Sequence, residues 1–239
     1  TLNISDLGIL PYEEALLLQR NTHQTVVDGR NSPTPSPFHL LLLEHDPAVI
    51  TLSKRPTAGE HLLATPEQLI KAGVVICRTD RGGDITYHGL GQLVGYPICD
   101  LNELSLRIHG YMRFLEQCII DVLAEFNICG VRDECATGVW VDGSKICAMG
   151  VRVSKWVSMH GFALNVTTNL DHFDLIVPCG LAGRSVTSMQ KILGDACPPM
   201  ETVKRVVSEK FSAWHAGKSG WKNFKFLNKF SVGIELVNP

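Results

Sequence analysis

The stretch Arg81-Gly82-Gly83-Asp84-Ile85-Thr86-Tyr87-His88-Gly89-Leu90-Gly91-Gln92 lies between two apolar runs, residues 74–77 and residues 93–98. Its glycines let the backbone adopt positive φ and come close to a ligand, because no Cβ stands in the way. A purely structural turn needs only one or two glycines with an Asn or Asp. This stretch also carries an arginine, a threonine, a tyrosine and a histidine. Its composition therefore favours a loop that wraps a ligand, with a structural turn as the alternative.

The glycine-rich stretch matches no nucleotide-binding fingerprint. The dinucleotide pattern needs a further glycine three residues after Gly91, where the chain has Val94. Gly217-Lys218-Ser219 resembles the end of a phosphate-binding P-loop, but the first glycine of that motif would fall at Ser212. The sequence therefore predicts neither an ATP site nor an NAD site.

Length and composition indicate an ordinary globular protein. The chain has 239 residues, of which 45% are hydrophobic and 19% charged, and its net charge is -2. This size fits one large domain or a domain with a small appendage, and the charge argues against a nucleic-acid binder driven by bulk charge. No stretch approaches the roughly eighteen apolar residues that span a bilayer. From the charge we expect no nucleic-acid partner, and from the lack of such a stretch no membrane partner.

The eight cysteines are scattered, and no two have the CxxC spacing of a zinc or redox site. Most lie within apolar runs, where a cysteine behaves as a small buried hydrophobe. We therefore expect reduced thiols, no metal and no cofactor. The N-terminus resembles neither a secretory signal nor an arginine-rich presequence, and the predicted location is the cytoplasm.

Hydrophobic periodicity predicts a mixed set of helices and strands. Helices are expected at residues 11–27, 66–72, 106–126 and 202–214, and strands at 39–44, 48–53, 74–77, 92–100, 139–141, 144–151 and 159–166. The first two strands read as a hairpin or strand pair, and Asp142-Gly143 as a type I′ turn. The pattern predicts an α+β domain with a mixed or antiparallel sheet flanked by helices. It would occupy residues 1–216, with residues 217–239 as a C-terminal extension packed on the same domain.

Cys179 differs from the other cysteines in its context. It stands between Pro178 and Gly180, which together favour a shaped turn that can present a nucleophile. A thiol with its usual pKa near 8.5 needs a neighbouring cation to be a thiolate at neutral pH. Lys145, next to the Asp142-Gly143 turn, is the candidate for that cation, and a solvated turn lysine is the alternative.

Four blocks of the chain together resemble the octanoyltransferase family, the lipoyl(octanoyl) transferases that begin endogenous protein lipoylation. The blocks are Arg81 to Gln92 with Tyr96-Pro97-Ile98, Lys145 to Gly150, His160 to Asn165, and Ile176 to Leu181. Their order and separations match the family, and they span about the middle half of the chain. The resemblance implies a fold related to the catalytic domains of biotin protein ligase and lipoate ligase.

The resemblance also implies a reaction. Cys179 would take an octanoyl group from the phosphopantetheine thioester of acyl carrier protein and pass it to a lysine of a lipoyl domain. The acceptors would be the lipoyl domains of 2-oxoacid dehydrogenases and the glycine cleavage H protein. Lys145 corresponds to the family's dyad lysine, which lowers the pKa of the thiol. Thioester exchange is nearly isoenergetic, so no ATP is expected to be needed for the acyl-enzyme.

The family's substrate-binding segments correspond to three groups of residues here. They are Arg81, Gly82, Gly83, Asp84, Ile85, Thr86, Tyr87 and His88; Ala148, Met149 and Gly150; and Gly161, Phe162 and Ala163. Two positions depart from the family, which commonly has proline at Leu90 and leucine at Phe162. The larger Phe162 would narrow or reshape the acyl tunnel, so chain-length preference is the property it puts in question. For Tyr87 and His88, a packing role is an alternative to a catalytic one.

Three further expectations concern the surroundings of the site. Backbone N–H groups beside Cys179 or within residues 148–150 are candidate donors to an oxyanion. A basic rim of Arg152, Lys155 and Arg184 would guide acidic protein partners. Two other functions stay open: an ATP-dependent lipoate or biotin ligase on the same fold, and a non-catalytic acyl-binding protein.

Overall fold

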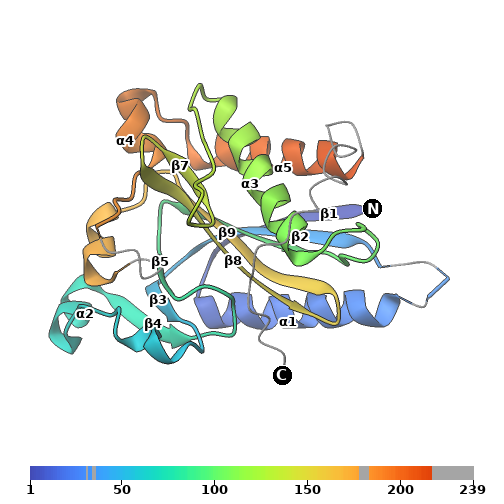
Figure 1. Ribbon diagram of the computed structural model, residues 1–239, viewed down its shortest axis with the longest axis horizontal. Coiled ribbons are helices and arrows are strands. Elements are labelled where there is room, and N and C mark those ends of the chain that lie inside the picture. Colours follow the sequence, from blue (N-terminus) through green and yellow to red (C-terminus); the bar gives the residue numbers. More distant parts are fainter. Residues whose placement is uncertain (31, 34–35, 178–182, 217–239) are drawn as a thin grey trace.

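A computed structural model describes residues 1–30, 32–33, 36–177 and 183–216, and within them the strands form two sheets (Figure 1). The larger sheet has six strands in the order β1-β2-β6-β9-β8-β7, and the smaller has the order β4-β3-β5. Their bounds are β1 Leu2–Leu10, β2 Phe38–His45, β3 Ala48–Leu52, β4 Val74–Arg78, β5 Ile85–His88, β6 Gln92–Ile98, β7 Val139–Val141, β8 Ser144–Ser154 and β9 Val157–Asn165. The predicted extension, residues 217–239, lies outside the described residues.

The six-stranded sheet is mixed, as predicted. Strand β1 runs parallel to β2, whereas the other neighbouring pairs are antiparallel. The predicted hairpin between β7 and β8 is confirmed, and both turn residues have positive φ, 48° at Asp142 and 75° at Gly143. Asp and Gly tolerate that conformation, so the local sequence determines this turn.

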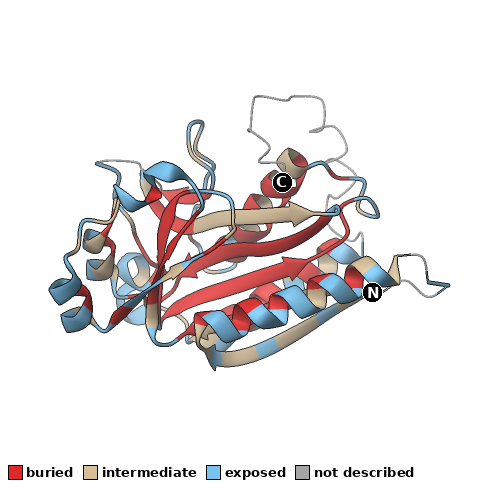
Figure 2. Ribbon diagram, turned by 90° about the horizontal axis from the view of Figure 1, so that it is seen from below, coloured by how far each residue is buried: buried red, intermediate tan, exposed pale blue. Residues whose placement is uncertain are grey.

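Helices cover both faces of the large sheet (Figure 1). α3 (Ile108–Ala124) and α5 (Met200–His215) pack on one face, and α1 (Tyr12–Gly29) packs on the other. The apolar spacing that predicts α3 places Leu115, Ile119 and Val122 at full burial. Along α1, exposed and buried residues alternate so that one side faces solvent (Figure 2).

The smaller sheet carries its own core with α2 (Pro66–Ala72), which begins and ends where the sequence predicts. Thr65 forms a capping box with Gln68 at its start, and Gly73 ends it with a φ of 65°. The remaining short elements are η1 Pro56–Gly59, η2 Leu170–Leu175, α4 Met189–Leu193 and η4 Gly194–Ala196.

Two sequence-based expectations are corrected by the fold. β2 and β3 form at the expected places but do not pair with each other, because β2 is paired on both edges by β1 and β6. β3 belongs to the smaller sheet, between β4 and β5. The glycine-rich stretch is not all loop, since residues Ile85–His88 form strand β5 within it.

Among the residues that the structure describes, no helix is long and apolar enough to cross a membrane. The same residues contain no cluster of His, Cys, Asp or Glu side chains arranged to hold a metal ion.

Candidate active site

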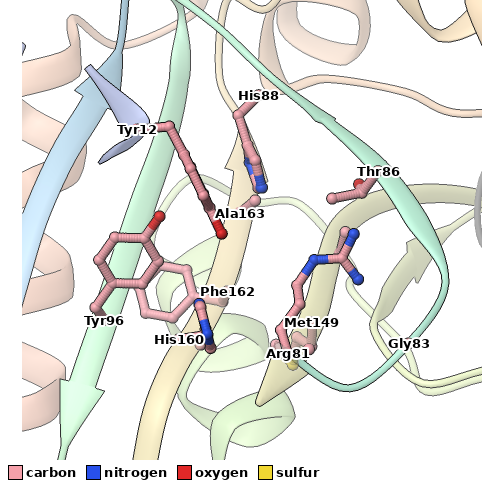
Figure 3. A pocket seen from close by; sticks show the side chains of 13 residues that line it. Tyr12, Arg81, Gly83, Thr86, His88, Tyr96, Met149, His160, Phe162 and Ala163 are labelled. Atoms are coloured by element: carbon pink, nitrogen blue, oxygen red, sulfur yellow. The ribbon is translucent and has the colours of Figure 1, made fainter. Parts of the chain in front are cut away.

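The three predicted substrate-binding segments meet at one pocket (Figure 3). The pocket lies where β5 and the glycine-rich stretch face β8 and β9, at the start of α1. It is lined by Tyr12, Arg81, Gly83, Thr86, His88, Tyr96, Ala148, Met149, Gly150, His160, Gly161, Phe162 and Ala163. The structure therefore brings together ten of the fourteen residues that the sequence assigned to substrate binding.

The pocket wall on β8 and β9 is made of small residues in register. Ala148 is opposite Ala163, and Gly150 is opposite Gly161. A Cβ on Gly150 would lie 2.7 Å from the carbonyl oxygen of Gly82, and the N–H of Gly82 donates to Val151 O at 2.9 Å. A Cβ on Gly82 would likewise lie 2.8 Å from Val151 O, so glycine at positions 82 and 150 lets the glycine-rich stretch lie directly on β8.

The other four predicted binding residues support the pocket from outside. Gly82 bonds to β8, and Ile85 is buried in the core of the smaller sheet. Asp84 is buried, with Oδ2 2.6 Å from Nδ1 of His61. Tyr87 also belongs to this core, and its hydroxyl is 2.8 Å from Nδ1 of His172. For Tyr87 the structure thus favours the packing alternative.

Arg81 is held by the smaller sheet. Its Nε and Nη2 donate to Thr51 Oγ1 at 3.2 and 2.8 Å, and Nη2 also donates to Thr51 O at 2.8 Å. These bonds fix the guanidinium at the pocket wall, so Arg81 supplies a positive charge of fixed position.

His88 faces the pocket as an uncharged group. Burial and the neighbouring His45 hold its pKa well below the usual value. Its Nδ1 lies 2.7 Å from Gln92 Oε1, while Gln92 Nε2 donates to Asn165 Oδ1 at 3.0 Å. Since the amide oxygen accepts, Nδ1 carries the proton and Nε2 remains as an acceptor. Tyr12 and His88 point into the same space from α1 and β5 (Figure 3).

The hydrogen bonds from His88 continue to Lys145. Asn165 Nδ2 donates to the carbonyl of Thr187 at 3.0 Å, and the N–H of Thr187 donates to the carbonyl of Lys145 at 2.9 Å. A chain of hydrogen bonds thereby connects the pocket residue His88 to the backbone of Lys145, the predicted dyad lysine.

Two more pocket residues belong to buried polar pairs. Tyr96 Oη is 2.8 Å from Nε2 of His45, and burial lowers the pKa of His45 to about 4. His160 Nε2 is 3.1 Å from Asp80, and this contact lowers the pKa of Asp80 to about 2. Next to the pocket lining, His45 and His160 are therefore neutral and Asp80 is ionised at neutral pH.

Lys145 lies on β8 with only 6% of its surface exposed, so it is not the solvated turn lysine of the alternative. Its Nζ lies 4.8 Å from the centre of the Trp140 ring. Its N–H donates to Ser185 O at 2.9 Å. A buried ammonium on an aromatic face has a fixed position, which suits a group that must act on one neighbouring atom.

Cys179 lies outside the described residues, which end at Val177 and resume at Gly183. On the near side, the N–H of Val177 donates to His61 O at 2.8 Å. On the far side, Ser185 and Thr187 bond to the backbone of Lys145. The described chain on the far side of Cys179 is thus attached directly to the predicted dyad lysine.

The three cations expected at a docking rim lie in different surroundings. Arg152 is paired with Asp80 at 2.9 Å, and Arg184 with Asp133 at 2.7 Å. Lys155 lies in the turn between β8 and β9, where its carbonyl accepts a hydrogen bond from Arg30. Two of the three charges are therefore compensated by carboxylates.

Three lining residues were missing from the predicted set: Tyr12, Tyr96 and His160. Tyr96 and His160 lie inside the sequence blocks that carry the family resemblance, and this position could have indicated that they line the pocket. Tyr12 comes from the start of α1, far from the glycine-rich stretch in sequence, and no local pattern points to it.

The departure at Phe162 is accommodated in the core. Its ring stacks on Phe211 with centroids 5.8 Å apart, and a Cβ on Gly95 of the paired strand would overlap it. The residue lines the pocket and is 2% exposed. The larger side chain thus occupies space that a glycine on β6 leaves open.

Comparison with known proteins supplies a family. Residues 11–212 match the model of the lipoyl protein ligase A/B catalytic domain. The chain is 44% identical over 230 residues to an octanoyltransferase of Caldicellulosiruptor saccharolyticus, covering 95% of this chain and 92% of that one. It is 46% identical over 207 residues to an octanoyltransferase of Gloeobacter violaceus, covering 86% of each.

Solved structures agree on the fold at low identity. A bi-partite lipoate protein ligase from Thermoplasma acidophilum has a TM-score of 0.64 at 16% identity, covering 88% of this chain and 81% of that one. A biotin protein ligase from Aquifex aeolicus has a TM-score of 0.51 at 13% identity, covering 94% and 76%. The expected relation to lipoate and biotin ligase catalytic domains is confirmed.

Proposed function

The chain belongs to the lipoyl protein ligase A/B catalytic domain family and is an octanoyltransferase, and on that basis we propose how it moves the acyl group. Cys179 is the nucleophile, Lys145 its proton partner, and the pocket beside β5, β8 and β9 holds the chain. The donor is octanoyl-acyl carrier protein, and the acceptor is a lysine of a lipoyl domain. The observation that carries this proposal is the single pocket formed by the three family segments.

In the first step, Lys145 takes the proton of the Cys179 thiol and the sulfur attacks the thioester carbonyl. The bond to the carrier-protein sulfur breaks, and that sulfur leaves as a thiol with the proton from Lys145. One thioester replaces another, so the exchange needs no energy source. Arg81 and residues 148–150 line the pocket, and we propose the guanidinium and the backbone N–H groups of residues 148–150 as donors to the oxyanion.

In the second step, the neutral amine of the acceptor lysine attacks the acyl-enzyme carbonyl. An amide bond forms, the proton of the amine passes to Lys145, and Cys179 leaves as a thiolate beside the resulting ammonium. The enzyme is restored, and the octanoyl amide is released on the lipoyl domain. The acceptors that we propose are the lipoyl domains of 2-oxoacid dehydrogenases and the H protein of glycine cleavage.

The pocket suits an aliphatic chain because small residues on β8 and β9 leave room along the strands. Each methylene removed from water contributes roughly 0.8 kcal/mol, so several kcal/mol are available to hold an octanoyl chain. The catalytic domain comprises residues 1–216. We place the enzyme in the cytoplasm, in line with the seven described cysteines, all of which are free thiols.

Intact-mass analysis after incubation with octanoyl carrier protein tests this function. We expect the mass of one octanoyl group on the protein, and no such adduct on Cys179→Ala. Cys129→Ala, which removes another exposed cysteine, is the matched control and should retain the adduct. Octanoyl carrier protein that is retained without a covalent adduct would instead support an acyl-binding protein.

The ligase alternative is tested with ATP and free octanoate or lipoate in place of the carrier protein. The proposal predicts no acyl-adenylate and no modified lipoyl domain under these conditions. Formation of acyl-adenylate, with turnover that survives Cys179→Ala, would contradict it.

A further inference from the structure

Trp140 on β7 holds two cations on one indole ring. Its side chain is buried, with 2% of the residue exposed, and it lies 4.8 Å from Nζ of Lys145 and 4.6 Å from Cζ of Arg184, measured from the ring centre. Cations at this distance are attracted by the electron-rich face of the ring, most strongly when water is excluded. In the sequence Lys145 precedes Cys179, and Arg184 follows it.

The lysine is confined around this contact. A Cβ on Gly138 would lie 3.5 Å from Cε of Lys145 and 2.6 Å from the carbonyl oxygen of Cys147. Glycine at this position, where φ is 127°, is required by the close carbonyl of Cys147, and the lysine stem passes it at ordinary van der Waals distance. The N–H of Gly138 donates to Glu116 Oε1 at 3.1 Å. Beyond this stem contact, the Lys145 ammonium lies over the indole of Trp140.

The arginine contact belongs to the chain that follows Cys179. Arg184 donates to Asp133 at 2.7 Å, and Asp133 also accepts the N–H groups of Cys135 and Ala136 at 2.9 Å. The neighbouring Ser185 bonds to the backbone of Lys145. Trp140 therefore contacts both the dyad lysine and the segment leading away from the proposed nucleophile.

We propose that Trp140 is a positioning residue of the transfer reaction, whose indole face fixes the Lys145 ammonium relative to the chain that carries Cys179. This inference rests on the proposed dyad. Without the aromatic face, the long lysine side chain gains other rotamers, and its charge spends less time beside the sulfur. The thiolate would then be less stabilised at neutral pH.

The alternative is a purely structural tryptophan. Its ring is buried and its Nε1 donates to Ala136 O at 3.3 Å, so removing it would lower stability in either case. A structural role predicts loss of stability with an unchanged pH dependence of the thiol. The positioning role predicts a change in that pH dependence, and recovery when another aromatic ring is present.

The test is the pH profile of iodoacetamide alkylation at Cys179, followed by peptide mass spectrometry in the folded protein. The exposed Cys129 serves as an internal reference. Trp140→Leu is expected to move the midpoint up by about one pH unit, which lowers the alkylation rate about tenfold at pH values well below the midpoint. Trp140→Phe should stay close to the unmodified protein. Trp214→Leu, a buried tryptophan of α5, should lower stability without moving the midpoint.

Fluorinated tryptophan keeps the shape of the ring and weakens its attraction for cations, so it covers the case in which Trp140→Leu does not fold. Uniform incorporation should raise the midpoint in the unmodified sequence but not in Trp140→Phe. The inference would be overturned if the midpoint stayed unmoved in Trp140→Leu or with fluorinated tryptophan. It would also be overturned if Trp140→Phe and Trp140→Leu shifted the midpoint equally.

Lys145→Ala in the same assay separates this inference from the proposed function. A raised midpoint in Lys145→Ala with no shift in Trp140→Leu removes the role of Trp140 and leaves the dyad standing. An unmoved midpoint in Lys145→Ala removes the dyad, and the role of Trp140 with it.

Discussion

The face of the six-stranded sheet under α3 and α5 is packed with aliphatic and aromatic side chains, whereas the α1 side also buries tyrosines and histidines around the pocket. Buried polar groups are costly unless they are hydrogen-bonded. On the α1 side, Tyr96 is bonded to His45, and His88 to Gln92. One face therefore mainly stabilises the fold, whereas the other holds buried polar groups whose desolvation lowers stability but which form the pocket.

The largest expected effect is on the apolar face. Leu115→Ala, at a fully buried position of α3, should lower the free energy of unfolding by about 2–5 kcal/mol. Because Leu115 does not line the pocket, the turnover of the folded fraction should change little. Denaturant titration beside a transferase assay measures both. Ile70→Ala, at a position that is 80% exposed, is the control, and equal losses in the two variants would break the comparison.

The second effect is a pH dependence that belongs to the polar face. His45 has its pKa lowered to about 4 by burial, so the unfolded chain binds a proton there that the folded chain does not. Stability should be unaffected above pH 6.5 and fall between pH 6.5 and 4, by roughly 3 kcal/mol from this group. His88, with a pKa lowered in the same direction, should add to the loss.

Thermal unfolding across this pH range measures the slope. His45→Gln should make the curve flatter between pH 6.5 and 4, although it also lowers stability at neutral pH by removing two hydrogen bonds. A slope that His45→Gln leaves unchanged would show that another group carries the pH dependence.

The third effect should appear in activity more than in stability. In Gly150→Ala the new Cβ would meet the carbonyl oxygen of Gly82 at 2.7 Å, which pushes the glycine-rich stretch off β8. We expect kcat/KM to fall at least about tenfold, because small displacements of a binding segment are costly in catalysis. Gly59→Ala, where a Cβ meets no atom within 4 Å, is the matched control. Full activity in Gly150→Ala would argue against the pocket.

The smallest effect links the two faces. Phe162→Leu removes part of a ring that packs in the apolar core and lines the pocket. We expect the ratio of kcat/KM for decanoyl over octanoyl carrier protein to rise at least about threefold, since the pocket gains space. Phe114→Leu makes the same change in the same core away from the pocket. A ratio that moves equally in both variants would show a general loosening of the core.

Local sequence predicts those elements whose determinants are local. The spacing of apolar residues predicts α3, Thr65 and Gly73 mark the ends of α2, and Asp142-Gly143 marks the β7–β8 turn. Elements that depend on distant partners were missed or misplaced. β5 is short and closely flanked by glycines, so it was not recognised. β3 was expected to pair with the preceding strand, but its partners are β4 and β5, which come later in the sequence.

The candidate site shows the same division. The glycine-rich stretch and the small-residue strands were predicted to bind substrate, and the pocket contains most of them. Tyr12 enters from α1, and the role of Gln92 in holding His88 depends on Asn165 of β9. Gln92 and Asn165 lie within the blocks that carry the family resemblance, but their contact with each other leaves no local pattern, because each alone resembles an ordinary core residue.

The most direct test of the account is a single-turnover chase with peptide mapping. The protein is loaded with octanoyl carrier protein, one half is digested, and a lipoyl domain is added to the other half. The account predicts the octanoyl mass on the peptide that contains Cys179, and its complete transfer to the lipoyl-domain lysine in the chase. An adduct on a different cysteine, or an adduct on Cys179 that does not chase while turnover continues, would contradict it.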